Sequence, residues 1–413
     1  MKILEVVHDY LPHHVGGTEI HAHQIACFLR ERGHEVLVAT TERDLEATEG
    51  TVRERELDGV PIREMVHQRE FAHMRESWRH PIAPGVFDAL LGEFQPDLVH
   101  FHHLAHWGAE CVAIARKHGA RVVVTLNDFH LLCVEATLLR PDGELCERGP
   151  EGGCTDCIAG LPLPGVADDD ELRAFHLSEL TRERLETHRW YLKDVPTVIC
   201  PSRFLADRMI RAGVLREDQV VVKRYGYPGP THPLRDAHSS GPLRVGYVGG
   251  IYPSKGVHVL VEAVASLDPG SVELDVHGIL EWFPDYVERL RGASQGAAIR
   301  FQGGFEPEQI DTVMQSHDVL VVPSIWYENM PITIQEAFRN GVPVVATDLG
   351  GMAEAVRDGV DGLLFPRGDA QALASILARL AADRPELERL AAGRPAVPTV
   401  EQIGAEIEAL YQE

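Results

Sequence analysis

Short apolar segments alternate with longer amphipathic segments along the first half of the chain. Apolar runs of this kind are typical of strands buried on both faces, whereas apolar positions repeating at helical spacing indicate helices, as in residues 20–29 and 105–118. The alternation predicts a parallel sheet with helices on both faces. The predicted strands are residues 3–7, 35–40, 97–101, 121–126, 197–200 and 220–222.

Residues 51–66 alternate between polar and apolar positions around Asp58-Gly59. An Asp-Gly pair between two such runs is typical of a tight β-hairpin. We therefore expect a hairpin at the edge of this sheet.

A second alternating series begins at Leu243, after a stretch rich in Pro, Gly, Ser and His. Its predicted strands are residues 244–248, 272–278, 299–304, 318–323, 343–348 and 362–365, and its predicted helices include residues 257–267, 370–382 and 399–411. The sequence therefore predicts two α/β domains. We expect a first domain over residues 1–228, a linker over 229–242, a second domain over 243–395 and a closing helix over 396–413 that crosses back to the first domain.

The amino-acid composition limits the kinds of partner that the protein is expected to bind. With 39 Lys and Arg against 63 Asp and Glu, the net charge is −24, which argues against non-specific binding to nucleic acid or to an anionic membrane surface. No apolar run approaches the length of a membrane span, and the first residues start a strand without the pattern of a signal peptide. We expect a cytoplasmic protein.

One segment of the first domain is a candidate for peripheral contact with the inner membrane face. Phe71, Met74 and Trp78 lie beside Arg75 and Arg79. Such a cluster can face lipid or an acceptor, but an ordinary surface helix or loop is the favoured interpretation.

Residues 323–338 hold the most informative pattern. They follow an apolar run and lead into a helical pattern, with Glu328 in the loop and Glu336 on the helix. The free N–H groups of a helix start attract phosphate, and carboxylates accept hydrogen bonds from sugar hydroxyls. The segment predicts a site for a nucleotide sugar, although two glutamates at this spacing also occur on ordinary surface helices.

Two glycine-rich turns join a strand to a helix. Gly16 and Gly17 precede the first helix, and residues 249–256 contain Gly249, Gly250, Lys255 and Gly256. Glycines there allow phosphates to approach the backbone, and Lys255 adds a positive charge. The second turn lacks the spacing of a P-loop. The alternative for either turn is a tight connection with no ligand.

Polar residues follow two predicted strands of the first domain. His100, His102 and His103 end one strand, and Asn127 and Asp128 follow the next. Ligands of parallel sheets bind beyond the carboxyl ends of the strands, so these residues share an edge with the first glycine turn. We select His102 as a candidate to contact a sugar hydroxyl or phosphate. The alternative is a solvated or internally hydrogen-bonded side chain.

Four of the seven cysteines cluster in residues 133–157, a segment too poor in apolar residues to fold alone. Cys133, Cys146, Cys154 and Cys157 are separated by 12, 7 and 2 residues. Four thiolates ending in a C-x2-C pair can form a tetrahedral zinc site. Free thiols or a disulfide are the alternatives.

Taken together, the motifs resemble the retaining glycosyltransferases of the GT-B fold, specifically family four, over nearly the whole chain. The resemblance is carried by residues 248–256, 323–328 and 341–347, by Glu336-Ala337, and in the first domain by residues 16–19, His102, residues 127–129 and 201–204. The Cys-rich insertion is similar to one found in a subset of this family.

The resemblance implies two Rossmann-like domains facing across a cleft, with the donor held mainly by the second. It assigns Glu336 to the ribose hydroxyls, Glu328 to the sugar, Lys255 to the diphosphate and His102 to the sugar. The other implied donor-binding residues are Gly16, Gly17, Gly249, Gly250, Gly256, Asn329, Met330, Pro331 and Ile332.

The resemblance also implies a mechanism. Attack occurs on the face that the diphosphate leaves, the leaving oxygen takes the acceptor's proton, and neither an enzymic nucleophile nor a catalytic metal is expected. One departure is Gly250, where many relatives have an Arg. Arg224 is one candidate to replace it.

The function predicted from these features is transfer of a sugar from a nucleoside-diphosphate sugar to a glycan, lipid-linked or small-molecule acceptor. Two alternatives stay open. One is an isomerase like the nucleotide-sugar 2-epimerases, which share the two-domain architecture. The other is a non-catalytic donor-binding partner subunit, for which Gly250 is the only indication.

Overall fold

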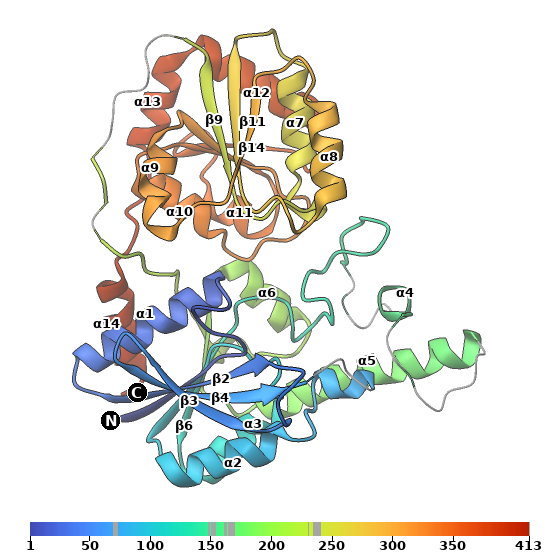
Figure 1. Cartoon of the computed structure of the whole chain (residues 1–413), viewed down its shortest axis with the longest axis vertical. Helices are drawn as coiled ribbons and strands as arrows, with labels where there is room; N and C mark the ends of the chain where they lie inside the picture. Colours follow the sequence, from blue (N-terminus) through green and yellow to red (C-terminus); the bar gives the residue numbers. More distant parts are fainter. Residues whose placement is uncertain are drawn as a thin grey trace. The chain divides into compact units, whose positions relative to one another are not determined.

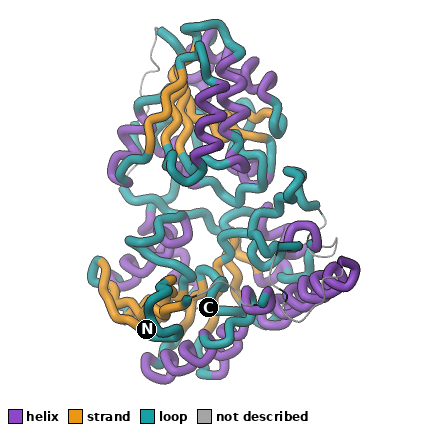
Figure 2. The backbone as a smooth tube through the Cα atoms, turned by 45° about the vertical axis from the view of Figure 1, so that its right-hand side comes forward, coloured by secondary structure: helices purple, strands orange, loops and turns teal. Residues whose placement is uncertain are grey.

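The computed structural model describes residues 1–68, 73–147, 149, 154–160, 163, 170–229, 231–233 and 241–412. The chain forms two compact units. Unit 1 comprises Met1–Gly226 and Val400–Glu413, and unit 2 comprises Tyr227–Thr399. Each unit is built around its own sheet (Figures 1 and 2). Residues 230 and 234–240 of the expected linker lie outside the described residues.

The sheet of unit 1 has the strand order β3-β4-β2-β1-β5-β6-β7-β8. Its strands are parallel except for β3, which runs antiparallel to β4. The hairpin of β3 and β4 lies at the edge, as predicted, and Asp58 and Gly59 at its turn both have positive φ, 50° and 78°. The strands are β1 Lys2–Val6, β2 Glu35–Arg43, β3 Val52–Leu57, β4 Val60–His67, β5 Leu98–Phe101, β6 Arg121–Thr125, β7 Thr197–Cys200 and β8 Val220–Val222.

The helices of unit 1 pack on this sheet, and the last of them comes from the end of the chain. Ile403, Ile407 and Tyr411 join the core formed by α1 and the neighbouring strands, so α14 is an integral part of unit 1. The helices are α1 Gly17–Glu31, α2 Ala83–Phe94, α3 Glu110–Lys117, α4 Thr155–Ile158, α5 Asp170–Leu192, α6 Arg203–Arg211 and α14 Val400–Leu410, with short 3-10 turns η1 Met74–Ser77 and η3 Glu217–Gln219.

Helix α3 is shorter than the helix expected over residues 105–118. His106 and Gly108 have positive φ values of 64° and 85°, which no residue inside an α-helix adopts. The preceding residues therefore form turns, and the helix begins at Glu110.

The apolar cluster named as a candidate for contact with lipid or acceptor is internal in the structure. Met74 and Trp78 are each 1% exposed and pack with Ile158, Leu177 and their neighbours. That prediction was wrong for both side chains, because residues of α4 and α5 cover them; Phe71 lies outside the described residues. Among the helices that are described, none combines the length and apolar character needed to cross a membrane.

Unit 2 contains a fully parallel sheet with the order β11-β10-β9-β12-β13-β14. Helices cover both faces, with α7 and α8 on one side and α9 and α10 on the other (Figure 1). The strands are β9 Leu243–Val248, β10 Val272–His277, β11 Ile299–Gly303, β12 Val319–Val322, β13 Val344–Thr347 and β14 Gly362–Phe365. The helices are α7 Val257–Ala265, α8 Pro284–Ala293, α9 Ile310–Gln315, α10 Ile332–Arg339, α11 Gly350–Ala355, α12 Ala370–Ala382 and α13 Arg384–Ala392, with 3-10 turns η4 Pro253–Lys255 and η5 Pro307–Gln309.

Candidate functional site

Two loops at the carboxyl ends of β9 and β12 are joined directly in unit 2. The N–H of Ile325 donates to the carbonyl oxygen of Ser254 at 2.9 Å. Gly256 has a φ of 68°, and a Cβ at this residue would overlap the carbonyl group of Pro323. Only glycine allows this backbone conformation and this close approach together. Gly256 therefore brings Lys255 against the loop that carries Glu328.

Glu328 is held by three donors at a single carboxylate oxygen. Oε1 accepts hydrogen bonds from Lys255 Nζ at 2.7 Å, Ser324 Oγ at 2.7 Å and Trp326 Nε1 at 2.8 Å. In the described part of the chain, no donor reaches Oε2. The carboxylate is thus fixed in orientation and keeps one oxygen for a ligand.

The electrostatics of this pair favour both charged forms. Burial alone would raise the pKa of Glu328, but Lys255 and the hydrogen bonds from Ser324 and Trp326 outweigh it and hold that pKa below its usual value. Burial alone would lower the pKa of Lys255, but Glu328 and Tyr252 outweigh it and hold that pKa above its usual value. The site therefore holds an ammonium group and a carboxylate at neutral pH.

The start of helix α10 lies directly after this loop. Pro331 is its N-cap residue, and no side chain caps the helix, so its first N–H groups are available to an anion. Asn329, Met330 and Pro331 are buried or nearly so, which keeps the loop rigid.

Gly351 braces the same loop from the start of α11. Its N–H donates to the carbonyl oxygen of Glu328 at 2.9 Å, and a Cβ there would overlap the carbonyl group of Asn329. The sequence interpretation missed this residue. A glycine pair after a buried strand, Gly350-Gly351, was the available signal, since the same pattern precedes α1 and follows β9.

Glu336 lies in the second turn of α10 in a different environment. Its carboxylate accepts no hydrogen bond from any residue that the structure describes. Burial raises its pKa to about 7, Arg339 partly offsets this, and Asp311 adds to it. Arg339 is itself held by Asp311 and the carbonyl of Pro228. Glu336 is therefore a carboxyl group with unused acceptor capacity.

The glycine turn after β9 explains the absence of a side chain at Gly250. The hydroxyl of Tyr247 donates to the carbonyl of Gly250 at 2.6 Å, and a Cβ on Gly250 would lie 2.5 Å from the ring of Tyr252. A larger residue would require this ring to move. A second cation reaches the β12 loop from elsewhere, because Arg367 Nε donates to the carbonyl oxygen of Ile325 at 2.6 Å. Arg224 belongs to unit 1.

In unit 1, the glycine turn before α1 already holds a carboxylate of the chain. Oε2 of Glu19 lies 2.5 Å from where a Cβ on Gly16 would be, and Glu19 accepts a hydrogen bond from its own N–H in the first turn of the helix. A phosphate at this helix end would meet that charge. The expected phosphate role of Gly16 and Gly17 is therefore not supported by the geometry.

His102 is also placed differently from the prediction. Its ring is 0% exposed, and Nε2 lies 2.5 Å from Oε2 of Glu5 on β1. Glu5 in turn accepts from the Tyr411 hydroxyl at 3.2 Å, and His100 is 2.6 Å from the same hydroxyl. The direct sugar contact expected of His102 was wrong, because this buried network encloses the ring.

His103, which follows His102 in the sequence, lies just beyond the carboxyl end of β5. His103 Nε2 lies 3.0 Å from Oδ2 of Asp128, and its Nδ1 accepts the N–H of Ala105 at 3.0 Å. The ring of His8 lies 4.2 Å from that of His103, and His8 Nε2 is 3.5 Å from Glu19 Oε1. Carboxylates and imidazoles thus alternate along this edge, which we call the polar rim (His8, Asp9, Glu19, His103 and Asp128).

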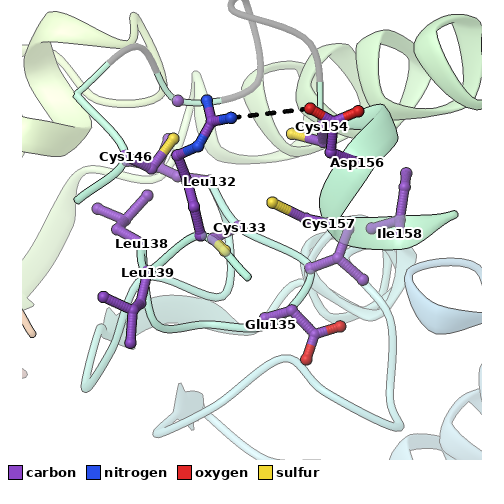
Figure 3. Close-up of a pocket in the computed structure, with 13 residues that line it drawn as sticks. Leu132, Cys133, Glu135, Leu138, Leu139, Cys146, Cys154, Asp156, Cys157 and Ile158 are labelled. Carbon is purple, nitrogen blue, oxygen red and sulfur yellow. Dashed lines mark ion pairs between the residues drawn. The ribbon is translucent and has the colours of Figure 1, made fainter. Parts of the chain in front are cut away.

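The four clustered cysteines line one pocket in unit 1 (Figure 3). All are free thiols in the structure, and each is partly buried. Burial and the neighbouring thiols raise the pKa of Cys154 to about 12. Cys133 follows β6, whereas Cys154 directly precedes α4 and Cys157 lies within it.

Comparison with known proteins places this architecture in a class. Over its full length the chain resembles Anabaena Alr3699/HepE, solved in complex with UDP, with a TM-score of 0.68 and 21% identity, covering 100% of both chains. The two parallel-sheet units are those of the GT-B fold found in glycosyltransferases.

Family models identify the chain further. The model described as "Glycosyltransferase Family 4" matches residues 15–224, and the model described as "Glycosyl transferases group 1" matches residues 234–394. The chain belongs to glycosyltransferase family 4.

Two relatives illustrate the range of the family. The amylovoran biosynthesis glycosyltransferase AmsK of Erwinia amylovora is 28% identical over 232 residues, 52% of this chain and 56% of that protein. The phosphatidyl-myo-inositol mannosyltransferase of Mycobacterium leprae is 37% identical over 177 residues, 39% of this chain and 46% of that protein. The chain thus spans about half the length of each of these two relatives.

Proposed function

We propose that this protein transfers a sugar, with retention of anomeric configuration, from a nucleoside-diphosphate sugar to a hydroxyl group of an acceptor. The proposal rests mainly on the surroundings of Glu328. Three donors fix one of its oxygens beside Lys255 and leave the other for a ligand, next to an uncapped helix start. Structures of Alr3699/HepE with UDP-glucose support a donor of this class.

Each donor group has a counterpart in unit 2. The Lys255 ammonium and the N–H groups at the start of α10 would stabilise the charge that develops on the leaving diphosphate. Oε2 of Glu328 would accept a hydroxyl of the transferred sugar. Glu336, with its unused acceptor capacity, would accept the ribose hydroxyls.

Retention follows if the acceptor attacks from the face that the diphosphate leaves. The new glycosidic bond forms as the bond to the phosphate oxygen breaks, and this oxygen takes the acceptor's proton. The step needs no enzymic nucleophile. In this proposal Lys255 has a second role, because its charge keeps the leaving oxygen close to the anomeric carbon.

The polar rim of unit 1 indicates the type of acceptor. Asp9, Glu19 and Asp128 alternate with His8 and His103 there. The carboxylates among these groups bind hydroxyls and repel phosphates. A hydroxyl-rich glycan or polyol, free or carried on a lipid, therefore fits this rim better than a phosphate group does.

Donor binding is the first test. Calorimetry with UDP-glucose, GDP-mannose and ADP-glucose should show saturable binding of one of them, and slow donor hydrolysis should follow. Glu328→Gln should lower hydrolysis by about 100-fold or more, because it removes the negative charge that pairs with Lys255 and replaces one of the two acceptor oxygens by an NH2 donor. Glu308→Gln, on the exposed surface of unit 2, is the matched control.

The outcomes separate the alternatives. Binding of none of the three donors would contradict the proposal. An epimerised sugar nucleotide detected by NMR would identify an isomerase. Donor binding with neither hydrolysis nor transfer to any glycan or polyol would identify a non-catalytic binding subunit.

A further inference from the structure

We propose that Cys133, Cys146, Cys154 and Cys157 bind a structural zinc ion, and that the buried side chain of Arg184 balances the charge of this site. The proposal does not depend on the proposed transferase activity.

The four thiols already converge on one pocket. Figure 3 shows Cys133, Cys146, Cys154 and Cys157 around the same space, from the loop after β6, the segment that follows it and the start of α4. Four thiols are the complete ligand set of a common structural zinc site, and soft sulfur ligands select zinc over calcium or magnesium.

Backbone hydrogen bonds hold the ligand residues in turns. The N–H of Cys133 donates to Phe129 O at 2.8 Å, that of Cys146 to Leu138 O at 2.8 Å, and that of Cys157 to Cys154 O at 3.0 Å. Arg140 and Asp156 add an ion pair at 3.7 Å across the pocket (Figure 3). The segments are therefore positioned by interactions that do not involve sulfur.

The sulfur atoms surround the pocket without closing on a point. In the described part of the chain, the only group of three or more potential ligands within 4.8 Å of one another is Glu5, His100 and His102. A tetrahedral zinc site with Zn–S bonds of about 2.3 Å requires S–S distances of about 3.8 Å. Binding would thus require the four side chains to move inward toward one point.

The cluster of Glu5, His100 and His102 is not proposed as a metal site. Its carboxylate and both imidazoles are engaged with each other, with Tyr411 and with Thr125. That set is a hydrogen-bond network in the core, in which His102 Nδ1 has no partner among the described residues.

The buried side chain of Arg184, on α5, also indicates a negatively charged site here. Its side chain is almost completely buried, its Nη atoms donate to the carbonyls of His130 and Leu131, and its Nε has no hydrogen-bond partner in the described residues. Its charge interacts most strongly with Cys133, Cys154 and Asp128. A buried cation is costly unless a negative charge compensates it.

Zinc binding would supply that negative charge. Each thiol loses its proton on binding, so Zn²⁺ and four thiols give a site with two net negative charges and release one proton per thiol. The guanidinium of Arg184 would then neutralise part of the charge and offer its Nε–H to a sulfur. Donors of this kind around the ligands orient and stabilise metal sites.

The position of the site links it to the polar rim. Arg184 and His188 hold the carbonyls of His130 and Leu131, directly after Asp128 at the end of β6. A metal at Cys133 would therefore fix the loop that presents Asp128 to His103. The ion would act by holding this edge of unit 1 in shape and would contact no substrate.

Metal content is the decisive measurement. Elemental analysis of the untagged full-length protein, purified without chelators, should give about one zinc per chain, and denaturing it with a chelator should release seven titratable thiols. Zinc well below one per chain would overturn the proposal, whether the four thiols are then found free or paired in disulfides. Reconstitution with Co²⁺ should give the intense visible bands of tetrahedral thiolate coordination; octahedral bands would also overturn it.

Variants test the ligands and Arg184 separately. Cys146→Ser and Cys157→Ser should lose the zinc, whereas Cys27→Ser, a free cysteine outside the cluster, should keep it. Arg184→Gln should weaken zinc affinity about 10- to 100-fold in competition with a chelator. Arg182→Gln, on the exposed side of the same helix, should not. Equal affinities for the two Arg variants would refute the role of Arg184, and Arg184→Lys with wild-type affinity would support it if the Gln variant fails to fold.

Discussion

The proposed contact of Glu336 with the ribose makes donor binding depend on pH, with a sign and size that follow from the structure. Its pKa in the free protein is raised to about 7, because burial disfavours the charge. Ribose hydroxyls donate to a carboxylate more strongly than to a carboxylic acid. The donor should therefore bind the ionised form, and its affinity should rise as pH increases through 7.

The magnitude follows from the ionised fraction. At pH 5.5 about 3% of the carboxyl groups with a pKa of about 7 are ionised, and at pH 8.5 nearly all are. The apparent dissociation constant scales inversely with the fraction of protein that can bind the donor. It should therefore be about 30-fold larger at pH 5.5 than at pH 8.5. A sugar nucleotide is the right ligand for this assay, because its diphosphate does not titrate in the same range as the terminal phosphate of a free nucleotide does.

Calorimetry from pH 5.5 to 8.5 would measure the effect in wild type and in Glu336→Gln. The Gln variant should bind weakly at every pH with a flat profile. Proton release should accompany binding to wild type near pH 6.5 and be absent in the variant. A flat wild-type profile, or an equal slope in both proteins, would refute the assignment of Glu336 to the ribose.

The folding stability should depend on pH in the opposite direction, because of the same residue. A carboxyl group whose folded pKa is raised favours folding below its usual pKa of 4.5, and this contribution is lost as pH rises through about 7. The difference corresponds to about 3 kcal/mol as an upper value. Glu336→Gln should therefore unfold at a higher temperature than wild type at pH 8, although it binds donor less tightly.

Three further changes test the construction of the two units. Gly256→Ala should cost about 3 kcal/mol or more in denaturant unfolding, because it combines a strained φ with an overlap, whereas Gly368→Ala, with a φ of 72° and nothing within 4 Å, should cost about 1 kcal/mol; equal costs would contradict the role of the close approach. Lys255→Ala should lower donor hydrolysis about 100- to 1000-fold, measured by product release at pH 7.5, and leave Glu328 as an uncompensated charge; near-normal turnover would refute the role given to the ammonium group. Tyr411→Phe should destabilise unit 1 by about 1–3 kcal/mol in thermal unfolding, because its hydroxyl joins two buried polar groups; an unchanged melting temperature would show that the network is dispensable.

The strands and the edge hairpin could be predicted because their signals are local. A strand buried on both faces requires an apolar run, and the turn at Asp58-Gly59 requires residues that tolerate positive φ. The paired loops of unit 2 were also accessible, since glycine turns and glutamates fall at strand ends. Periodicity locates such features without knowledge of their neighbours.

Side-chain burial could not be predicted in the same way, because distant segments decide it. Trp78 is covered by residues of α5 that lie about a hundred positions later in the chain. His102 is enclosed because Glu5, from the start of the sequence, pairs with it, and Tyr411, from the end of the sequence, donates to the same carboxylate group. The two adjacent histidines 102 and 103 look alike in sequence and are both buried, yet the first pairs with Glu5 and the second with Asp128, a difference set by side chains distant in the sequence.

The contrast between Glu328 and Glu336 argues against assigning roles from residue type. Both are glutamates of one loop-helix segment, yet hydrogen bonds and Lys255 lower the pKa of the first, while burial without a partner raises the pKa of the second. A carboxyl group with a pKa of about 7 would ordinarily be a good general acid or base. The proposed mechanism requires neither, because in it the departing phosphate takes the proton. Under this proposal, the raised pKa of Glu336 is the cost of an acceptor site for ribose hydroxyls, which donor binding would relieve.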